Sequence, residues 1–382
     1  MREGQLQNLV KVTLNDCTKC KTLTLGELPN LEVLYIEGML ELEKWPEVDC
    51  PSLDWLKFSN CPKLRKLPNL FFMLRVLKIK SCKSLKTLPV APRLMFLKLI
   101  DNPILEDWGE GLLSWNGTND RGQPIRWQQG SLFNLLEMEL RSCPKMQALP
   151  KHLAPQKLEI SGCELLVALP KPHFAQRLQH LALDACHDGT LVREIPNTSS
   201  LYSLVISGIS NLTSLPKWPQ LPGLKALYIR DCKDLVTLSK REEGSLPTLI
   251  SLTFLSIRNC PMLVKLAEEL PATLECLSIV SCPLLQSLGP KEILKSLPSL
   301  KDLYIEDCPM LQSLPEDGLP SSLQHLQIQG CKLLTERCQK EDGGGPDWPK
   351  VMHIPDLEID FPVVSSALPK KKWYRSFPRF GG

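Results

Sequence analysis

One pattern recurs along most of this sequence, and its clearest copy runs from Leu300 to Pro315. The copy reads L-x-x-L-x-I-x-x-C-x-x-L-x-x-L-P, where x marks a variable position. Leu303 and Ile305 alternate with the two-residue period of a strand that has one buried face. Pro315 closes the unit because proline lacks a backbone N–H and restricts the residue before it. One unit cannot bury its own apolar row, so the pattern predicts stacked units.

The spacing between copies, mostly about 20–23 residues, is typical of leucine-rich repeats. We therefore predict an α/β solenoid over residues 1–338, with about fourteen repeats. It is a horseshoe with a parallel β-sheet on the concave face and mostly loops, turns and short helices on the convex face. The fourteen predicted strand cores are Val12-x-Leu14, Leu34-x-Ile36, Leu56-x-Phe58, Leu77-x-Ile79, Leu97-x-Leu99, Met138-x-Leu140, Leu158-x-Ile160, Leu181-x-Leu183, Leu204-x-Ile206, Leu227-x-Ile229, Leu255-x-Ile257, Leu277-x-Ile279, Leu303-x-Ile305 and Leu326-x-Ile328.

Fifteen cysteines would suggest a disulfide scaffold, but eleven of them occupy one slot, three residues after the second apolar residue of a strand core. The eleven are Cys17, Cys61, Cys82, Cys143, Cys163, Cys186, Cys232, Cys260, Cys282, Cys308 and Cys331. Met39, Asn102 and Ile209 fill the slot in the other copies. A repeated slot predicts small, buried, free thiols with no disulfide and no metal, and reduced thiols indicate the cytosol or nucleus.

Motifs for catalysis and cofactors are missing from the sequence. It has no Gly-Lys dipeptide and hence no P-loop, no H-E-x-x-H and no G-x-S-x-G. Cys17-x-x-Cys20 has no second pair nearby, so we predict no metal site there. We expect no catalytic, cofactor-binding or metal-ligating residue and no small-molecule substrate, and therefore no enzyme.

Charge and hydropathy limit the partners further. The formal net charge of +3 is small for 382 residues, so nucleic acid is not expected as a partner. No apolar run is long enough to span a membrane, and no secretory signal follows Met1.

Three segments depart from the repeat. The stretch 109–130 is rich in glycine and polar residues and predicts an inserted loop, in which Trp115 and Trp127 either pack on the solenoid or contact a partner. Residues 339–382 are expected to form a C-terminal cap, with 347–361 covering the end of the stack, and a basic tail. The repeat begins near Leu6 without an apparent cap, so we expect a further segment upstream.

The middle residue of each strand core should face solvent on the concave face, together with its neighbours. Lys57, Lys78 and Lys98 occupy this position in three consecutive copies, and Glu139 and Glu159 follow. Adjacent like charges oppose folding slightly, so the lysine row is a candidate site for an acidic partner; the alternative is an ordinary solvated face. The candidates around this row are Trp55, Lys57, Lys78, Lys80, Phe96 and Lys98.

A second group of concave residues lies farther along the chain. Tyr228 and Tyr304 occupy the middle position, and Arg230 and Arg258 follow strand cores. Tyrosine and arginine are common in binding hot spots, so these four residues are also candidate protein contacts. His180 and His325, each directly before a strand leucine, are expected at the surface.

The repeat, with cysteine in its slot and Leu-Pro at its end, resembles the leucine-rich repeats of plant intracellular disease-resistance proteins. These are the nucleotide-binding leucine-rich-repeat receptors, particularly the coiled-coil class. The stretch from Gly343 to Pro355, GGGPDWPKVMHIP, looks like the C-terminal end of that class. The resemblance covers nearly the whole chain.

The resemblance implies a recognition role in plant defence. In this family the repeats sense pathogen effectors, directly or through a guarded host protein, and restrain a nucleotide-binding switch domain. The expected partners are therefore an effector, a host protein or the receptor's own switch domain. ADP or ATP is expected only in a missing upstream domain. The implied location is the cytoplasm, with the nucleus or the inner face of the plasma membrane as alternatives.

Two other classes of protein remain open. A scaffold or substrate adaptor without an immune role would fit the same repeats; an F-box-like helical segment upstream would favour it. A secreted receptor ectodomain is disfavoured by the free cysteines, although a glycan on Asn116 would support it.

Overall fold

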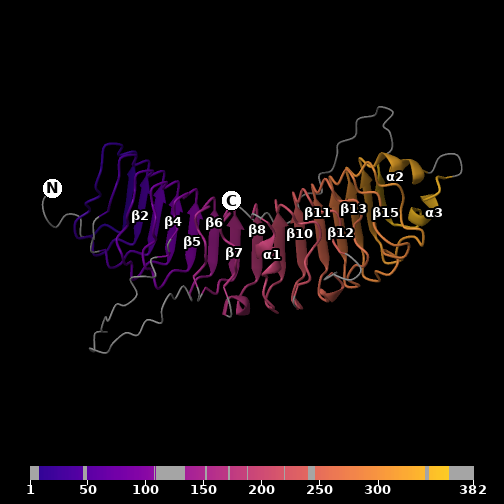
Figure 1. Cartoon of the computed structure of the whole chain (residues 1–382), viewed down its shortest axis with the longest axis horizontal. Helices are drawn as coiled ribbons and strands as arrows, with labels where there is room; N and C mark the ends of the chain where they lie inside the picture. The colour runs from indigo at the N-terminus through magenta and orange to yellow at the C-terminus, as the bar shows by residue number, and fades with distance from the viewer. Residues whose placement is uncertain are drawn as a thin grey trace.

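The computed structural model describes residues 8–45, 50–106, 108, 134–150, 153–170, 173–186, 188–218, 220–239, 246–339 and 344–360. Within these residues, fifteen strands lie side by side in one parallel sheet, in the order of the sequence. Figure 1 shows them as a long, gently curved row connected by turns and short helices. The predicted leucine-rich-repeat solenoid is confirmed.

The strands have four or five residues each. Their bounds are β1 Lys11–Asn15, β2 Val33–Glu37, β3 Trp55–Ser59, β4 Val76–Lys80, β5 Phe96–Ile100, β6 Glu137–Arg141, β7 Lys157–Ser161, β8 His180–Asp184, β9 Ser203–Ser207, β10 Ala226–Arg230, β11 Phe254–Arg258, β12 Cys276–Val280, β13 Asp302–Glu306, β14 His325–Gln329 and β15 Asp356–Ile359. The helices are α1 Thr190–Arg193, α2 Lys332–Arg337 and α3 Trp348–Val351, with 3₁₀ turns at His173–Gln176 and Leu246–Thr248.

All fourteen predicted strand cores lie in β1–β14, and neighbouring cores are in register. Leu303 of β13 aligns with Leu277 on one side and Leu326 on the other. Leu303 and Ile305 are both fully buried. Because strand side chains alternate between faces, this register stacks the leucines into one continuous core and leaves the middle residue of each core on the concave face.

The last strand, β15, is not among the predicted cores. Leu357 and Ile359 align with Leu326 and Ile328 of β14, so the segment expected to cover the stack adds a strand to it. Leu357-x-Ile359 has the same alternation as the other cores, and this signal could have revealed it. At the other end, β1 pairs only with β2 among the described strands, and Val12 and Leu14 are half-buried.

The residue directly after each of the strands β1–β14 has a left-handed backbone. Asn60 has φ 53° and Asp307 has φ 52°, and Gly330 takes the same place after β14 with φ 62°. Asparagine, aspartate and glycine tolerate this conformation best. A Cβ on Gly330 would lie 2.4 Å from Oδ1 of Asp307, so glycine also relieves a steric conflict there.

The cysteine slot follows this turn, and the structure confirms it as a buried ladder from Cys61 onward. The thiols donate to the carbonyl two residues earlier, as from Cys260 Sγ to Arg258 O over 3.5 Å. All fifteen cysteines lie in the described residues, and none forms a disulfide. Cys17 is an exception, because it is exposed in the half-buried first unit.

Asn102 fills the same slot with a fully buried amide. Its Oδ1 accepts from the N–H of Cys82, and its Nδ2 donates to the carbonyls of Ile79 and Ile100. Asn102→Ala should therefore destabilise the fold by about 1–3 kcal/mol, because buried backbone groups lose their partners. Asn102→Cys should cost less, since cysteine occupies this slot elsewhere. Chemical denaturation of both variants tests this, and equal losses would contradict the assigned role of the amide.

The predicted loop 109–130, with Trp115 and Trp127, lies outside the described residues, as do residues 361–382 of the tail. The division into 1–338 and 339–382 stays a prediction.

Candidate protein-binding surface

The middle positions of the strands form a row across the concave face, as predicted. Lys57 of β3 is in register with Lys78 of β4, and Lys78 with Lys98 of β5. The row continues through Glu139 and Glu159. Three lysines therefore stand side by side, followed by two carboxylates.

Most of this lysine charge has a local partner. Lys57 Nζ lies 3.3 Å from Glu37 Oε2, and Lys98 Nζ lies 2.7 Å from Glu139 Oε2. Lys78 Nζ instead lies 4.9 Å from the centre of the Trp55 ring. Neighbouring strands thus offset the repulsion that the sequence pattern suggests. These side chains are half-exposed, so the ion pairs are weak enough for a partner to replace.

Two flanking candidates complete this part of the face. Lys80 ends β4 and is exposed, in register with Ser59 and Ile100. Trp55 and Phe96 each lie in the first position of a strand, on either side of Val76. The structure therefore brings together all six candidates of this group, whereas Trp115 and Trp127 lie outside the described residues.

A network of opposite charges follows the lysine row. Arg141 lies between the carboxylates of Glu139 and Glu159, and Lys157 Nζ is 2.8 Å from Glu159 Oε1. Burial alone would raise the pKa of Glu159, but Lys157 and Arg141 outweigh it and hold the pKa below its ordinary value. Glu159 is thus charged at neutral pH and fixes both cations.

The second candidate group lies on β10–β13. The rings of Tyr228 and Phe254 are 5.2 Å apart, and the Arg230 guanidinium lies 5.2 Å from the Tyr228 ring centre. Arg258 is in register with Arg230. Phe254 was missed by the sequence interpretation, although it directly precedes a strand leucine, where Trp55 and Phe96 also lie.

Small residues separate this cluster from Tyr304. Between Tyr228 and Tyr304, the middle positions are Ser256 and Ser278. Ser278 is only 8% exposed. Burial, with nearby Asp302, raises the pKa of Tyr304 to about 12, so its hydroxyl remains a neutral donor. The two tyrosines border a stretch of the concave face whose middle positions have short side chains.

The expectation that His180 lies at the surface is wrong, whereas His325 is exposed as expected. His180 is 5% exposed, and its Nδ1 lies 3.0 Å from Ser203 Oγ of the next strand. His180 is in register with Lys157 on one side and Ser203 on the other. Sequence position alone could not reveal this, because it depends on the neighbouring strand.

Burial lowers the pKa of His180 below its ordinary value of 6.5. Protons therefore bind more strongly to the unfolded chain, so the stability of the fold should fall as pH drops below about 6.5. His180→Gln should reduce this loss. Thermal unfolding of both proteins at pH 5 and pH 7.5 measures it, with His325→Gln as the exposed control. An unchanged pH dependence in His180→Gln would contradict the assignment.

Little else in the described residues suggests chemistry. No group of three or more His, Cys, Asp or Glu side chains within them is arranged to hold a metal ion. Burial raises the pKa of Cys186 to about 12, which keeps its thiol protonated and unreactive. None of the described helices is long and apolar enough to cross a membrane.

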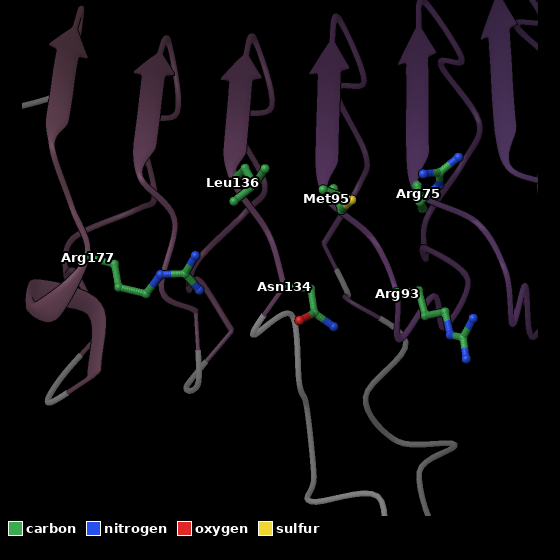
Figure 2. A pocket seen from close by; sticks show the side chains of 6 residues that line it. All are labelled: Arg75, Arg93, Met95, Asn134, Leu136 and Arg177. Carbon is green, nitrogen blue, oxygen red and sulfur yellow. The ribbon is translucent and has the colours of Figure 1, made fainter.

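A hollow of about 380 Å³ lies beside the sheet, below the starts of the strands in Figure 2. Its lining residues are Arg75, Arg93, Met95, Asn134, Leu136 and Arg177. None of them was predicted as a site residue.

Comparisons with known proteins show what the chain as a whole is similar to. The Arabidopsis thaliana protein SUPPRESSOR OF npr1-1, CONSTITUTIVE 1 is 27% identical over 61% of this chain and 14% of its own length. Disease resistance protein RPS4B, also from Arabidopsis thaliana, is 24% identical over 85% of this chain and 22% of its own length. TMV resistance protein N from Nicotiana glutinosa is 24% identical over 61% of this chain.

This chain is similar in sequence to plant disease-resistance proteins. It spans only 14–22% of the length of these curated relatives, and its described part consists of leucine-rich repeats. The resemblance to the repeat region of these receptors is therefore confirmed, whereas the coiled-coil subclass stays a prediction.

No family model matches the chain. Solved leucine-rich-repeat structures align with it at low similarity. A protein from Bacteroides ovatus has a TM-score of 0.36 at 15% identity, over 85% of this chain and 81% of that protein. The repeat domain of the type III effector XopL has a TM-score of 0.33 at 24% identity, over 52% of this chain and 62% of that domain. The fold assignment rests on the strand order and register of the chain itself.

Proposed function

We propose that this chain is the protein-recognition region of a plant immune receptor. It senses pathogen effectors, directly or through a guarded host protein, and restrains a nucleotide-binding switch domain. The observation that carries this proposal is the continuous concave surface, on which aromatic, lysine and arginine side chains from consecutive strands stand in register. The sequence similarity to disease-resistance proteins supplies the biological setting.

The proposed mechanism is a shift between two populations. The repeats bind the switch domain in the resting state, and an effector or host protein binds better to the released state. Any ADP or ATP would be bound by the switch domain, because these repeats contain no P-loop sequence. The receptor would act in the cytoplasm, in the nucleus or at the inner face of the plasma membrane.

A titration with a purified nucleotide-binding domain from a plant disease-resistance protein tests this function, with ADP and with ATP. We expect saturable binding that Lys78→Glu and Tyr304→Ala each weaken about tenfold, because each removes a contact worth on the order of 1.4 kcal/mol. Arg65→Glu, an exposed residue outside the strands, is the matched control. Equal weakening by the control would contradict a concave binding face.

The second candidate function is a scaffold or substrate adaptor without an immune role. The same concave surface would then hold a substrate. Saturable binding to a purified ubiquitin-ligase core subunit, with none to the switch domain, would favour this alternative.

A further inference from the structure

The leading edge of strands β4–β8 carries an unusual distribution of charge. We define this edge by two residues for each strand. They lie one position and three positions before the first residue of that strand. These ten residues are Met73, Arg75, Arg93, Met95, Asn134, Leu136, Ala154, Gln156, Arg177 and Gln179. They include three arginines and no carboxylate. The position directly before β2 holds Glu32, and the position directly before β3 holds Asp54. The repeat itself therefore allows carboxylates at this edge.

Six of the ten residues line the hollow described above. Met95 and Leu136 are half-buried neighbours, joined by a hydrogen bond from Leu136 N to Met95 O of 2.8 Å. In Figure 2 the Arg177 side chain extends from one side toward Leu136, and Arg75 and Arg93 lie on the opposite side. The hollow thus has two apolar side chains between cations.

The arginines differ in how much of their charge is compensated. Arg75 binds Asp54 through two nitrogens, with Nη2 2.8 Å from Oδ2. Arg93 lies over the Phe72 ring at 5.2 Å, and its Nη1 is 3.2 Å from Met73 Sδ. Within the described residues, the contacts of the Arg93 guanidinium are thus with a ring and a thioether, and not with a carboxylate. An exposed guanidinium without a counter-charge attracts anions, and its planar fork matches a carboxylate.

We propose that this hollow binds an acidic segment of a protein partner. An apolar side chain of the segment lies on Met95 and Leu136, and flanking carboxylates accept hydrogen bonds from Arg93 and Arg177. The proposal rests on the protein-recognition function and deepens it, because it adds a second contact area outside the concave rows and fixes the chemistry of the partner as acidic and apolar.

The experiment uses the full chain and a short labelled peptide in which leucines alternate with aspartates and glutamates. Fluorescence anisotropy should show saturable binding that weakens as salt is added. Arg93→Glu and Arg177→Glu should each weaken it about tenfold or more, since a charge-assisted contact of about 1.4 kcal/mol changes affinity tenfold. Arg65→Glu, with the same change of charge elsewhere, should leave the affinity unchanged.

Several outcomes would overturn the proposal. These are equal binding of a peptide with Asn and Gln in place of the acids, an equal loss in Arg65→Glu, the absence of binding, or tighter binding of a single-stranded oligonucleotide. Circular dichroism of each variant confirms that it is folded. Lys78→Glu lies in the concave row and should not affect the acidic peptide. A lack of peptide binding would therefore not contradict binding of the switch domain. A lack of switch-domain binding would likewise not account for binding of the peptide.

Discussion

Leu255→Asp should unfold the repeats around β11, with a loss of about 4 kcal/mol or more. Leu255 is fully buried and stacks in register between Leu227 and Leu277. An aspartate there would place a charge among leucines with no cation within the core. Because each repeat contacts only its neighbours, the damage should begin in the units on either side.

Ser256→Asp is the matched control, since the adjacent side chain faces the concave side and is half-buried. It should change stability by less than about 1 kcal/mol. Thermal unfolding and hydrogen exchange over 226–280 measure both effects. Similar losses in the two variants would overturn the assignment of the strand faces.

Asp347→Asn should loosen the C-terminal end of the solenoid. Asp347 is fully buried, and its Oδ2 accepts from Arg337 Nε at 2.8 Å and from the N–H of Leu314 at 3.3 Å. Lys350 Nζ lies 2.8 Å from its Oδ1. One carboxylate thus connects the turn after β13 with α2 and α3. Removing its charge leaves two cations unmatched and should cost about 2–3 kcal/mol, because both cations retain some contact with water.

The pH dependence of this loss has a defined sign. Burial alone would raise the pKa of Asp347, but Arg337 and Lys350 outweigh it and hold the pKa below the ordinary 3.8. The carboxylate therefore stabilises the fold fully above about pH 4, and this contribution disappears as pH falls through the lower folded pKa. The difference between wild type and Asp347→Asn should shrink in acid.

Hydrogen exchange over 344–360 and thermal unfolding at neutral pH measure the effect. Asp317→Asn, an exposed carboxylate in the same region, is the control and should be nearly silent. If the two variants lose the same stability, Asp347 does not hold this end of the stack.

The candidate surface was only partly predictable from the sequence. The lysine row was predicted because strand period and repeat spacing place Lys57, Lys78 and Lys98 at equivalent positions. The ion pairs of this lysine row were not predicted. Glu139, the partner of Lys98, is 41 positions away in the sequence, across the 109–130 insertion. The arginine hollow was also missed, because Arg93 and Arg177 line one cavity only when the four units of β5–β8 stack.

By itself, the sequence determined the repeat, the strand register and the buried cysteine slot. These properties depend on local alternation and on a nearly constant spacing, and both can be counted along the chain. Only the tertiary structure decided which charges are neutralised, why His180 is buried, and where cations surround an apolar hollow. Those outcomes depend on side-chain sizes and distances between adjacent turns, and no single repeat contains that information.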